Sequence, residues 1–256
     1  MTTNRPNGSL YTKIESQIAT VEFGHPASNS FTLELLNRLT AELDTLSEND
    51  AVTVILLKSE GKKTFCAGAS FDELMQVSNL EEGEVFFSGF ANVINAMRRC
   101  NKIIVGRIQG KAVGGGVGLI SACDYAFAVE SASIKLSELS IGIAPLVIAP
   151  AVERKIGVAA ISELSLAATE WKTAYWAQEK GLYAKVFDNL EALDKEIDFF
   201  TQKLSAYNPS AIVEWKKVLW NNTDHWSSLL TERAKITGSL VLSEFAKYAL
   251  GKFKKK

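Results

Sequence analysis

The sequence has few of the residues that most often carry metal or serine-peptidase chemistry. Its 256 residues contain two histidines, His25 and His225, and three cysteines, Cys66, Cys100 and Cys123. Three cysteines are an odd number, and their spacings lack the paired motifs of zinc sites. Two isolated histidines do not support a Ser-His-Asp arrangement. We therefore expect no metal site and no serine-peptidase triad, and we expect a reducing, cytoplasmic location.

The sequence also lacks an excess of charge and a long apolar segment. Its 28 basic and 29 acidic residues give a formal net charge of −1, so no overall field attracts nucleic acid or an acidic membrane surface. The N-terminal stretch MTTNRPNGSL has no apolar core of the kind that a signal peptide needs. The longest apolar run, IGIAPLVIAPAV, contains two prolines and is too short to span a bilayer. These absences predict a soluble protein without nucleic-acid or membrane partners.

The first 150 residues alternate between strand and helix patterns. Apolar, β-branched runs predict strands near 18–24, 51–58, 102–110 and 124–129, and the runs without alternation are typical of strands buried on both faces. Thr32 is a candidate N-cap for a helix whose leucines recur at helical spacing, namely Leu35, Leu36, Leu39, Leu43 and Leu46. Interleaved strands and helices predict an α/β fold.

The pattern changes after about residue 146, where it becomes almost wholly helical. A weak strand is predicted at 184–187, a helix at 210–221 and a last helix from 226 to 250. The coarse prediction is therefore an α/β core followed by a helical tail.

Three consecutive glycines, Gly114–Gly116, lie between the predicted strand at 102–110 and an apolar helical segment. Glycine is unfavourable inside both helices and strands. No Gly-Lys-Ser/Thr follows, which excludes a Walker phosphate loop, and Leu119 stands where the dinucleotide fingerprint requires its last glycine. What remains is a strand-to-helix turn whose first N–H groups lack an intrahelical acceptor and are open to a ligand oxygen. Tight packing of strand on helix is the alternative explanation.

A second turn of small residues favours the ligand-binding explanation. Ala67-Gly68-Ala69 follows the predicted strand at 51–58 and precedes another helical segment. Two strand ends thus each offer backbone N–H groups without an obvious acceptor. Two such donors aimed at one point form an oxyanion hole, which stabilises a carbonyl oxygen as it gains negative charge.

Three stretches resemble the signatures of the crotonase superfamily, the enoyl-CoA hydratases and isomerases. They are VILLKSEGKKTFCAGASFDEL, IQGKAVGGGVGLISACDYAFA and SIKLSELSIGIAP, and the likeness extends from about residue 12 to the end of the chain. The resemblance implies an α/β fold with a crotonase-like ββα spiral core over 1–200 and a C-terminal helical trimerisation region over 201–256. It implies an acyl-CoA thioester as substrate, no separate cofactor because coenzyme A is part of that substrate, and a homotrimer or a dimer of trimers.

The same resemblance assigns roles to residues. It implies that the N–H groups of Ala69 and Gly115 hold the thioester oxygen, and that Glu138 is one of the two glutamates that hydratases of the family commonly use. Gly118 stands at the position of the other glutamate, which makes the chain similar to a single-glutamate subset that includes 3-methylglutaconyl-CoA-type hydratases. It also implies substrate contacts at six positions, namely Ala67, Gly68, Phe71, Gly114, Gly118 and Pro145.

The lone carboxylate leaves three functions open. We expect a hydratase, in which Glu138 orients the water and moves its proton, with room at Gly118 for that water or for a branched acyl group. Partial burial between SIKL and an apolar stretch is expected to raise the pKa of Glu138. A Δ3,Δ2-enoyl-CoA isomerase is the alternative in the same chemistry. A non-catalytic acyl-CoA-binding or scaffold protein is the alternative of another class.

Overall fold

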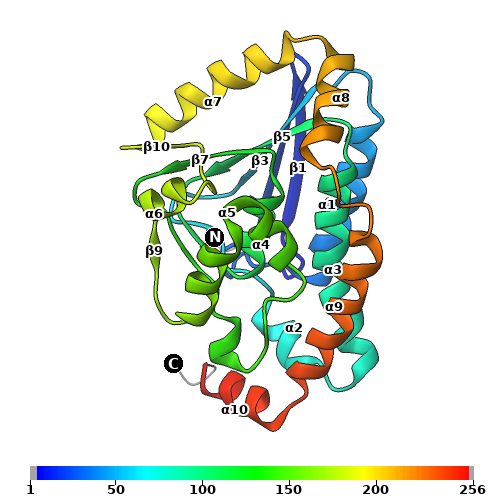
Figure 1. Cartoon of the computed structure of the whole chain (residues 1–256), viewed down its shortest axis with the longest axis vertical. Helices are drawn as coiled ribbons and strands as arrows, with labels where there is room; N and C mark the ends of the chain where they lie inside the picture. Colours follow the sequence, from blue (N-terminus) through cyan, green and yellow to red (C-terminus); the bar gives the residue numbers. More distant parts are fainter. Residues whose placement is uncertain (1–4, 254–256) are drawn as a thin grey trace.

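The strands form two sheets (Figure 1) in the computed structural model, which describes residues 5–253 except for the side chain of Phe253. The ends of the predicted core and tail, residues 1–4 and 254–256, lie outside the described residues. The large sheet has the order β1 (Ser9–Glu15), β2 (Ile18–Gly24), β3 (Val54–Ser59), β5 (Ile103–Ile108), β7 (Tyr125–Val129) and β10 (Lys185–Phe187). The small sheet has the order β4 (Thr64–Cys66), β6 (Lys111–Val113), β8 (Ser133–Lys135) and β9 (Lys172–Thr173).

Both sheets are mainly parallel. In the large sheet only β1 runs antiparallel to its neighbour, β2, and in the small sheet only β9 runs antiparallel, to β8. The strands predicted from β-branched runs are all present as β2, β3, β5, β7 and β10. The α/β prediction is therefore confirmed, and the buried, non-alternating strands are the central ones of the large sheet.

A repeated ββα path connects the two sheets. Each of the strands β3, β5 and β7 is followed by a strand of the small sheet, β4, β6 or β8, and then by a helical segment. Because β4, β6 and β8 are parallel neighbours, their C-terminal ends meet at one edge of the small sheet. The turns that leave Cys66, Val113 and Lys135 therefore lie side by side, and these turns carry the residues singled out above.

The first helix after β1 and β2 forms where its capping residue and its spaced leucines predict it. Thr32 caps α1 (Leu33–Ser47) by accepting a hydrogen bond from the Leu35 N–H (3.1 Å), and all five predicted leucines of this helix are buried. The other helices of this half are α2 (Phe71–Gln76), α3 (Leu80–Arg99), α4 (Gly115–Ala122) and the 3₁₀ helix η1 (Glu138–Ile141).

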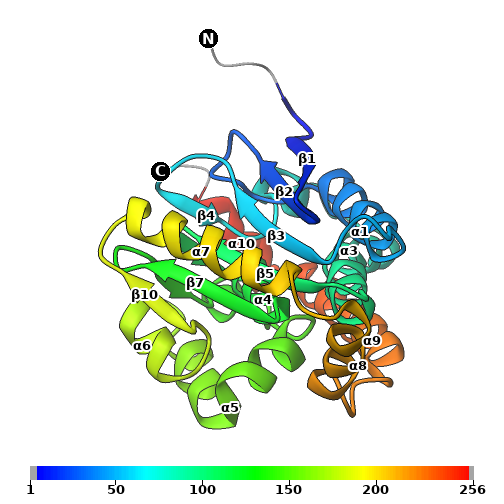
Figure 2. The ribbon, with the colours of Figure 1, turned by 90° about the horizontal axis from the view of Figure 1, so that it is seen from above.

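The second half of the chain is helical, as expected, apart from β9 and β10. Its helices are α5 (Ala149–Leu166), α6 (Ala174–Glu179), α7 (Leu190–Ser205), α8 (Pro209–Leu219), α9 (Trp226–Val241) and α10 (Glu244–Phe253). Helix α7 lies across the strands of the large sheet (Figure 2), and α9 runs beside α3 (Figure 1). No helix within residues 5–253 is both long and apolar enough to cross a membrane.

The prediction of one continuous helix from 226 to 250 is wrong. Helix α9 ends at Val241, and α10 turns away from it to contact α2 and η1 (Figure 1). The break has a local cause, because the Ser243 side chain accepts a hydrogen bond from the Ala246 N–H (3.2 Å) and so starts a new helix. This turn brings the end of the chain back to the ββα core.

The contact between α3 and α9 depends on two glycines that face each other. A Cβ on Gly238 would lie 2.6 Å from the carbonyl carbon of Gly83 and 2.7 Å from the backbone nitrogen of Glu84, and a Cβ on Gly83 would meet Gly238 equally closely. Neither helix can therefore carry a larger residue at this crossing without moving.

The crossing predicts an unequal response to two glycine-to-alanine changes. Gly238→Ala is expected to lower the free energy of unfolding by about 2 kcal/mol, because overpacking outweighs the gain in helix propensity. The matched control is Gly251→Ala in α10, where a Cβ meets nothing within 4 Å and a gain of up to about 1 kcal/mol is expected. Urea denaturation measures both, and equal effects would contradict the packing argument.

Candidate active site

A cavity of about 370 Å³ opens at the edge of the small sheet where the three turns meet. All the residues predicted for the site except Gly118 line it, namely Ala67, Gly68, Ala69, Phe71, Gly114, Gly115, Glu138 and Pro145. Four separate parts of the chain supply them, and the parallel order of β4, β6 and β8 brings these parts together. The roles assigned to these residues stay predictions.

The first turn carries an amide N–H at the wall of the cavity. Gly68 has a φ of +89°, and its carbonyl accepts a hydrogen bond from the Phe31 N–H (2.8 Å). On the other side of the turn, the Ser70 N–H donates to the Phe31 carbonyl (2.7 Å). The N–H of Ala69, between these two anchored residues, has no acceptor in the part of the chain that the structure describes. It is thus free to bind a ligand oxygen.

The second turn places another free N–H next to the first. Gly114 has a φ of +52° and donates its N–H to the Lys135 carbonyl (2.9 Å). Gly115 is the first residue of α4, so its N–H has no acceptor within the helix. A Cβ on Gly68 would lie 3.6 Å from the Gly115 nitrogen, which shows that the two turns are in contact. Two free N–H groups on turns that touch are what a two-donor oxyanion hole requires.

Glu138, the first residue of η1, stands beside these donors. Its Oε1 atom lies against Gly114, where a Cβ would be 2.6 Å away. Its Oε2 atom is buried and has no hydrogen-bond partner among the described residues. Burial of the carboxyl raises the pKa of Glu138 from 4.5 to about 7, which confirms the expected direction. A carboxyl with such a pKa exchanges a proton readily near neutral pH.

The turn that carries Glu138 is fixed from both ends. The Ser140 hydroxyl donates to the Ser137 carbonyl (2.6 Å), and η1 is followed by its C-cap residue Gly142, which has a φ of +81°. A Cβ on Gly142 would lie 2.5 Å from the Phe245 ring, so α10 rests directly on this turn. The end of the chain therefore supports the position of Glu138.

The free space expected at Gly118 is not there. Gly118 is buried and does not line the cavity, and a Cβ on it would lie 2.5 Å from the Cγ2 atom of Ile148. Ile148, at the start of α5, fills the volume beside Gly118 and forms part of the cavity wall itself. The expectation that a water or a branched acyl group would occupy this space is therefore wrong.

The cavity wall includes residues that the sequence did not single out. Most are apolar and come from α2, α3, the last residue of η1 and the segment after it, namely Leu74, Phe87, Phe90, Ile141, Ile143, Leu146 and Val147. Their apolar periodicity predicts core and does not separate a cavity wall from it. Thr237, which reaches the cavity from α9, carries no local signal, whereas Lys135 and Ser137 were close to a predicted site residue in the chain.

Glu138 is the only carboxylate among the residues that line this cavity. Within residues 5–253, no group of three or more histidine, cysteine and acidic side chains is arranged to hold a metal ion. Besides the lysine and hydroxyl side chains of its wall, the cavity thus offers two free amide donors and one carboxyl with a raised pKa.

Comparison with known proteins identifies the family of the chain. The family model described as enoyl-CoA hydratase/isomerase matches residues 13–247. The chain is 28% identical over 203 residues to the peroxisomal Delta(3,5)-Delta(2,4)-dienoyl-CoA isomerase of Arabidopsis thaliana, and the matched region covers 75% of this chain and 72% of that protein. It is 26% identical over 246 residues to a probable enoyl-CoA hydratase of Bacillus subtilis, and the matched region covers 95% of this chain and 94% of that protein.

A solved structure supports the fold. The enoyl-CoA hydratase from Bacillus halodurans superposes with a TM-score of 0.87 at 21% identity, over 95% of this chain and 99% of that one. The chain therefore belongs to the enoyl-CoA hydratase/isomerase family, and the crotonase-like fold predicted from the three sequence signatures is confirmed.

The raised pKa of Glu138 predicts a pH-dependent stability difference. Because the native state holds this proton more tightly than the unfolded chain, the stability it contributes is fully present below pH 4.5 and is lost as pH rises through about 7. Glu138→Gln cannot ionise. Its free energy of unfolding relative to the natural protein is therefore expected to rise by on the order of 2–3 kcal/mol between pH 5 and pH 8.

Urea denaturation of both proteins at the two pH values measures this difference, and the exposed Glu153→Gln on α5 is the control. A difference for Glu138→Gln that is the same at both pH values would show that this carboxyl titrates normally.

Proposed function

We propose that the protein is an enoyl-CoA hydratase, which adds water across the double bond of an α,β-unsaturated acyl-CoA. The observation that carries the proposal is the buried, unpartnered Oε2 atom of Glu138 beside the free N–H groups of Ala69 and Gly115. A carboxylate without a protein partner, next to two donors for one oxygen, is suited to act on a substrate bound between them.

The reaction follows from these three groups. The thioester oxygen accepts hydrogen bonds from both N–H groups, which draws electrons from the double bond and makes C3 electrophilic. The Glu138 carboxylate accepts a hydrogen bond from a water molecule and takes its proton while the water oxygen bonds to C3. The electron pair moves to the thioester oxygen as an enolate. Glu138 then passes the proton to C2, which restores the carbonyl and the carboxylate.

The rest of the cavity supports an apolar acyl group. Its wall beyond the donors consists mainly of leucine, isoleucine, valine and phenylalanine side chains from α2, α3 and the segment after η1. Such a surface favours a hydrocarbon chain and excludes water other than the reacting one. The same exclusion of water keeps the carboxyl of Glu138 poised between its two protonation states.

A double-bond isomerase is a second candidate, and the packing at Gly118 favours it. Ile148 fills the space beside Gly118, so the cavity holds a single carboxylate. An isomerase needs only one, which takes a proton from C2 of a 3-enoyl-CoA and returns it at C4 while the oxyanion hole holds the dienolate. One of the relatives is named as a dienoyl-CoA isomerase.

The substitution Glu138→Gln tests the shared mechanism. The amide keeps the shape of the side chain but has no basic oxygen, so we expect turnover to be abolished while binding of the thioester is retained. Turnover is followed by loss of the ultraviolet absorbance of a conjugated enoyl-CoA, and binding by calorimetry with the same thioester. Full activity of the variant would remove Glu138 from the mechanism.

The products separate the candidate functions. Hydration in oxygen-18 water is expected to place the heavy oxygen at C3 of the product. Conversion of a 3-enoyl-CoA to its conjugated isomer, without hydration, would replace the hydratase by the isomerase. Binding of CoA thioesters without any product would instead indicate an acyl-CoA-binding or scaffold protein.

Substitution of Gly115 by proline tests the role of its N–H group, but the packing around Gly115 requires that the test be made in a protein with a second substitution. Any Cβ on Gly115 would lie 2.2 Å from the ring of Phe90, so the comparison is made in a Phe90→Ala protein. There, Gly115→Pro removes the donor and Gly115→Ala retains it at similar volume. We expect the proline variant to turn over about 10²–10³-fold more slowly than the alanine variant. Equal rates in two folded proteins would show that this N–H does not bind the reacting oxygen.

A further inference from the structure

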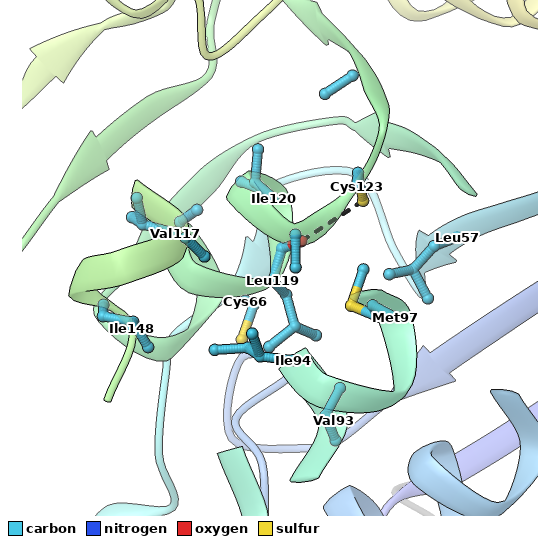
Figure 3. Close-up of a cluster of buried hydrophobic side chains, with 14 of the residues drawn as sticks. Leu57, Cys66, Val93, Ile94, Met97, Val117, Leu119, Ile120, Cys123 and Ile148 are labelled. Atoms are coloured by element: carbon cyan, nitrogen blue, oxygen red, sulfur yellow. Dashed lines mark hydrogen bonds between the residues drawn. The ribbon is translucent and has the colours of Figure 1, made fainter. Parts of the chain in front are cut away.

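Cys66 occupies a special place in the core. It is the last residue of β4 and is completely buried, within an apolar cluster that includes Ile94 of α3 and Leu119 of α4 (Figure 3). Directly after it, the chain forms the turn that carries the first amide donor. Nothing in the chemistry proposed above uses its thiol.

The Cys66 side chain touches both turns that supply the oxyanion hole. The Gly68 N–H donates a hydrogen bond to its Sγ atom (3.3 Å), and the Sγ atom lies 3.9 Å from the Gly68 carbonyl oxygen, to which the thiol donates. On the other side, a Cβ on Gly116 would lie 2.8 Å from the Cβ of Cys66 and 3.1 Å from its Sγ atom. One buried side chain therefore separates the two turns and holds one of them.

The bond from Gly68 decides where the next amide points. Successive N–H groups in a turn with positive φ point in different directions. A hydrogen bond from the Gly68 N–H to sulfur inside the core therefore directs the N–H of Ala69, which lines the cavity, away from that sulfur. Burial also raises the pKa of the Cys66 thiol to about 12. The group thus stays neutral and keeps both its proton and its acceptor site at the pH of the reaction.

We propose that Cys66 is a positioning residue for the oxyanion hole, whose thiol sets the direction of the Ala69 N–H and its distance from the Gly115 N–H. The inference rests on the proposed function only in taking these two groups as the donors for the thioester oxygen. It assigns to Cys66 a role beyond filling the core, which its burial alone would explain.

The test measures the carbonyl itself. Two aligned donors lower the C=O stretching frequency of a bound acyl-CoA thioester, and Raman difference spectroscopy of a conjugated enoyl-CoA on the Glu138→Gln protein reports that shift without turnover. In this background Cys66→Ala is expected to lose a large part of the shift, and Cys66→Ser, which restores an acceptor, to recover most of it. With Glu138 intact, Cys66→Ala is expected to lower kcat about 10-fold and to leave KM within about twofold.

Cys123 provides the matched control. It is equally buried in the same cluster (Figure 3), but it lies at the far end of α4 and its thiol donates to the Leu119 carbonyl (3.4 Å). Cys123→Ala removes the same atom from the core and is expected to leave the carbonyl shift and kcat unchanged. Cys66→Val, which refills the volume without a hydrogen-bonding group, replaces Cys66→Ala if that variant does not fold.

Each outcome has one meaning. An undiminished carbonyl shift in Cys66→Ala or Cys66→Val, or an equal loss in Cys66→Ala and Cys123→Ala, would reduce Cys66 to a packing residue. Absence of any shift in the protein with natural Cys66 would overturn the oxyanion hole itself, and with it the proposed function. The two failures are therefore distinguishable.

Discussion

The close approach of two backbone turns is the constraint on which the rest of this structure depends. The turn after β4 and the start of α4 are in direct contact, and the side chain of Cys66 lies against both of them. A Cβ on Gly68 would lie 2.9 Å from the Val113 carbonyl oxygen, and one on Gly116 would lie 2.8 Å from Cys66. The parallel pairing of β4 with β6 brings these turns together, and glycine permits the remaining contact. Two amide groups can converge on one point only because both conditions hold.

The carboxyl group beside this point depends on parts of the chain far away. Glu138 stands on a single 3₁₀ turn, which by itself makes too few hydrogen bonds to hold a side chain in place. Helix α10 rests on that turn through Phe245, and α5 closes the cavity with Ile148. Burial by these elements, and not a neighbouring charge, raises the pKa of Glu138. The helical tail therefore helps to shape the candidate site although it supplies neither the proposed donors nor the carboxyl group.

The sequence predicted the parts of this arrangement that are local and long enough to show a period. The central strands and the Thr32-capped helix α1 were recognised in this way, the two turns were recognised by their small residues, and the resemblance added Glu138. Strands β4, β6, β8 and β9 have only two or three residues, too few for any periodicity. The filling of the space at Gly118 by Ile148 and the reach of Thr237 into the cavity are tertiary contacts without a local pattern. The break between α9 and α10 rests on one serine within an otherwise helical run.

Because both proposed donors are main-chain groups, the side chains at their positions matter by their size and not by their chemical type. At Gly115 the ring of Phe90 limits the size of a side chain, and proline would delete the N–H group itself. At Glu138, by contrast, the proposed role depends on the charge and basicity of the side chain. Related chains can thus differ in the residues around the donors while the path of their backbone stays the same. A comparison of backbone geometry will therefore recognise such sites even where the side chains no longer match.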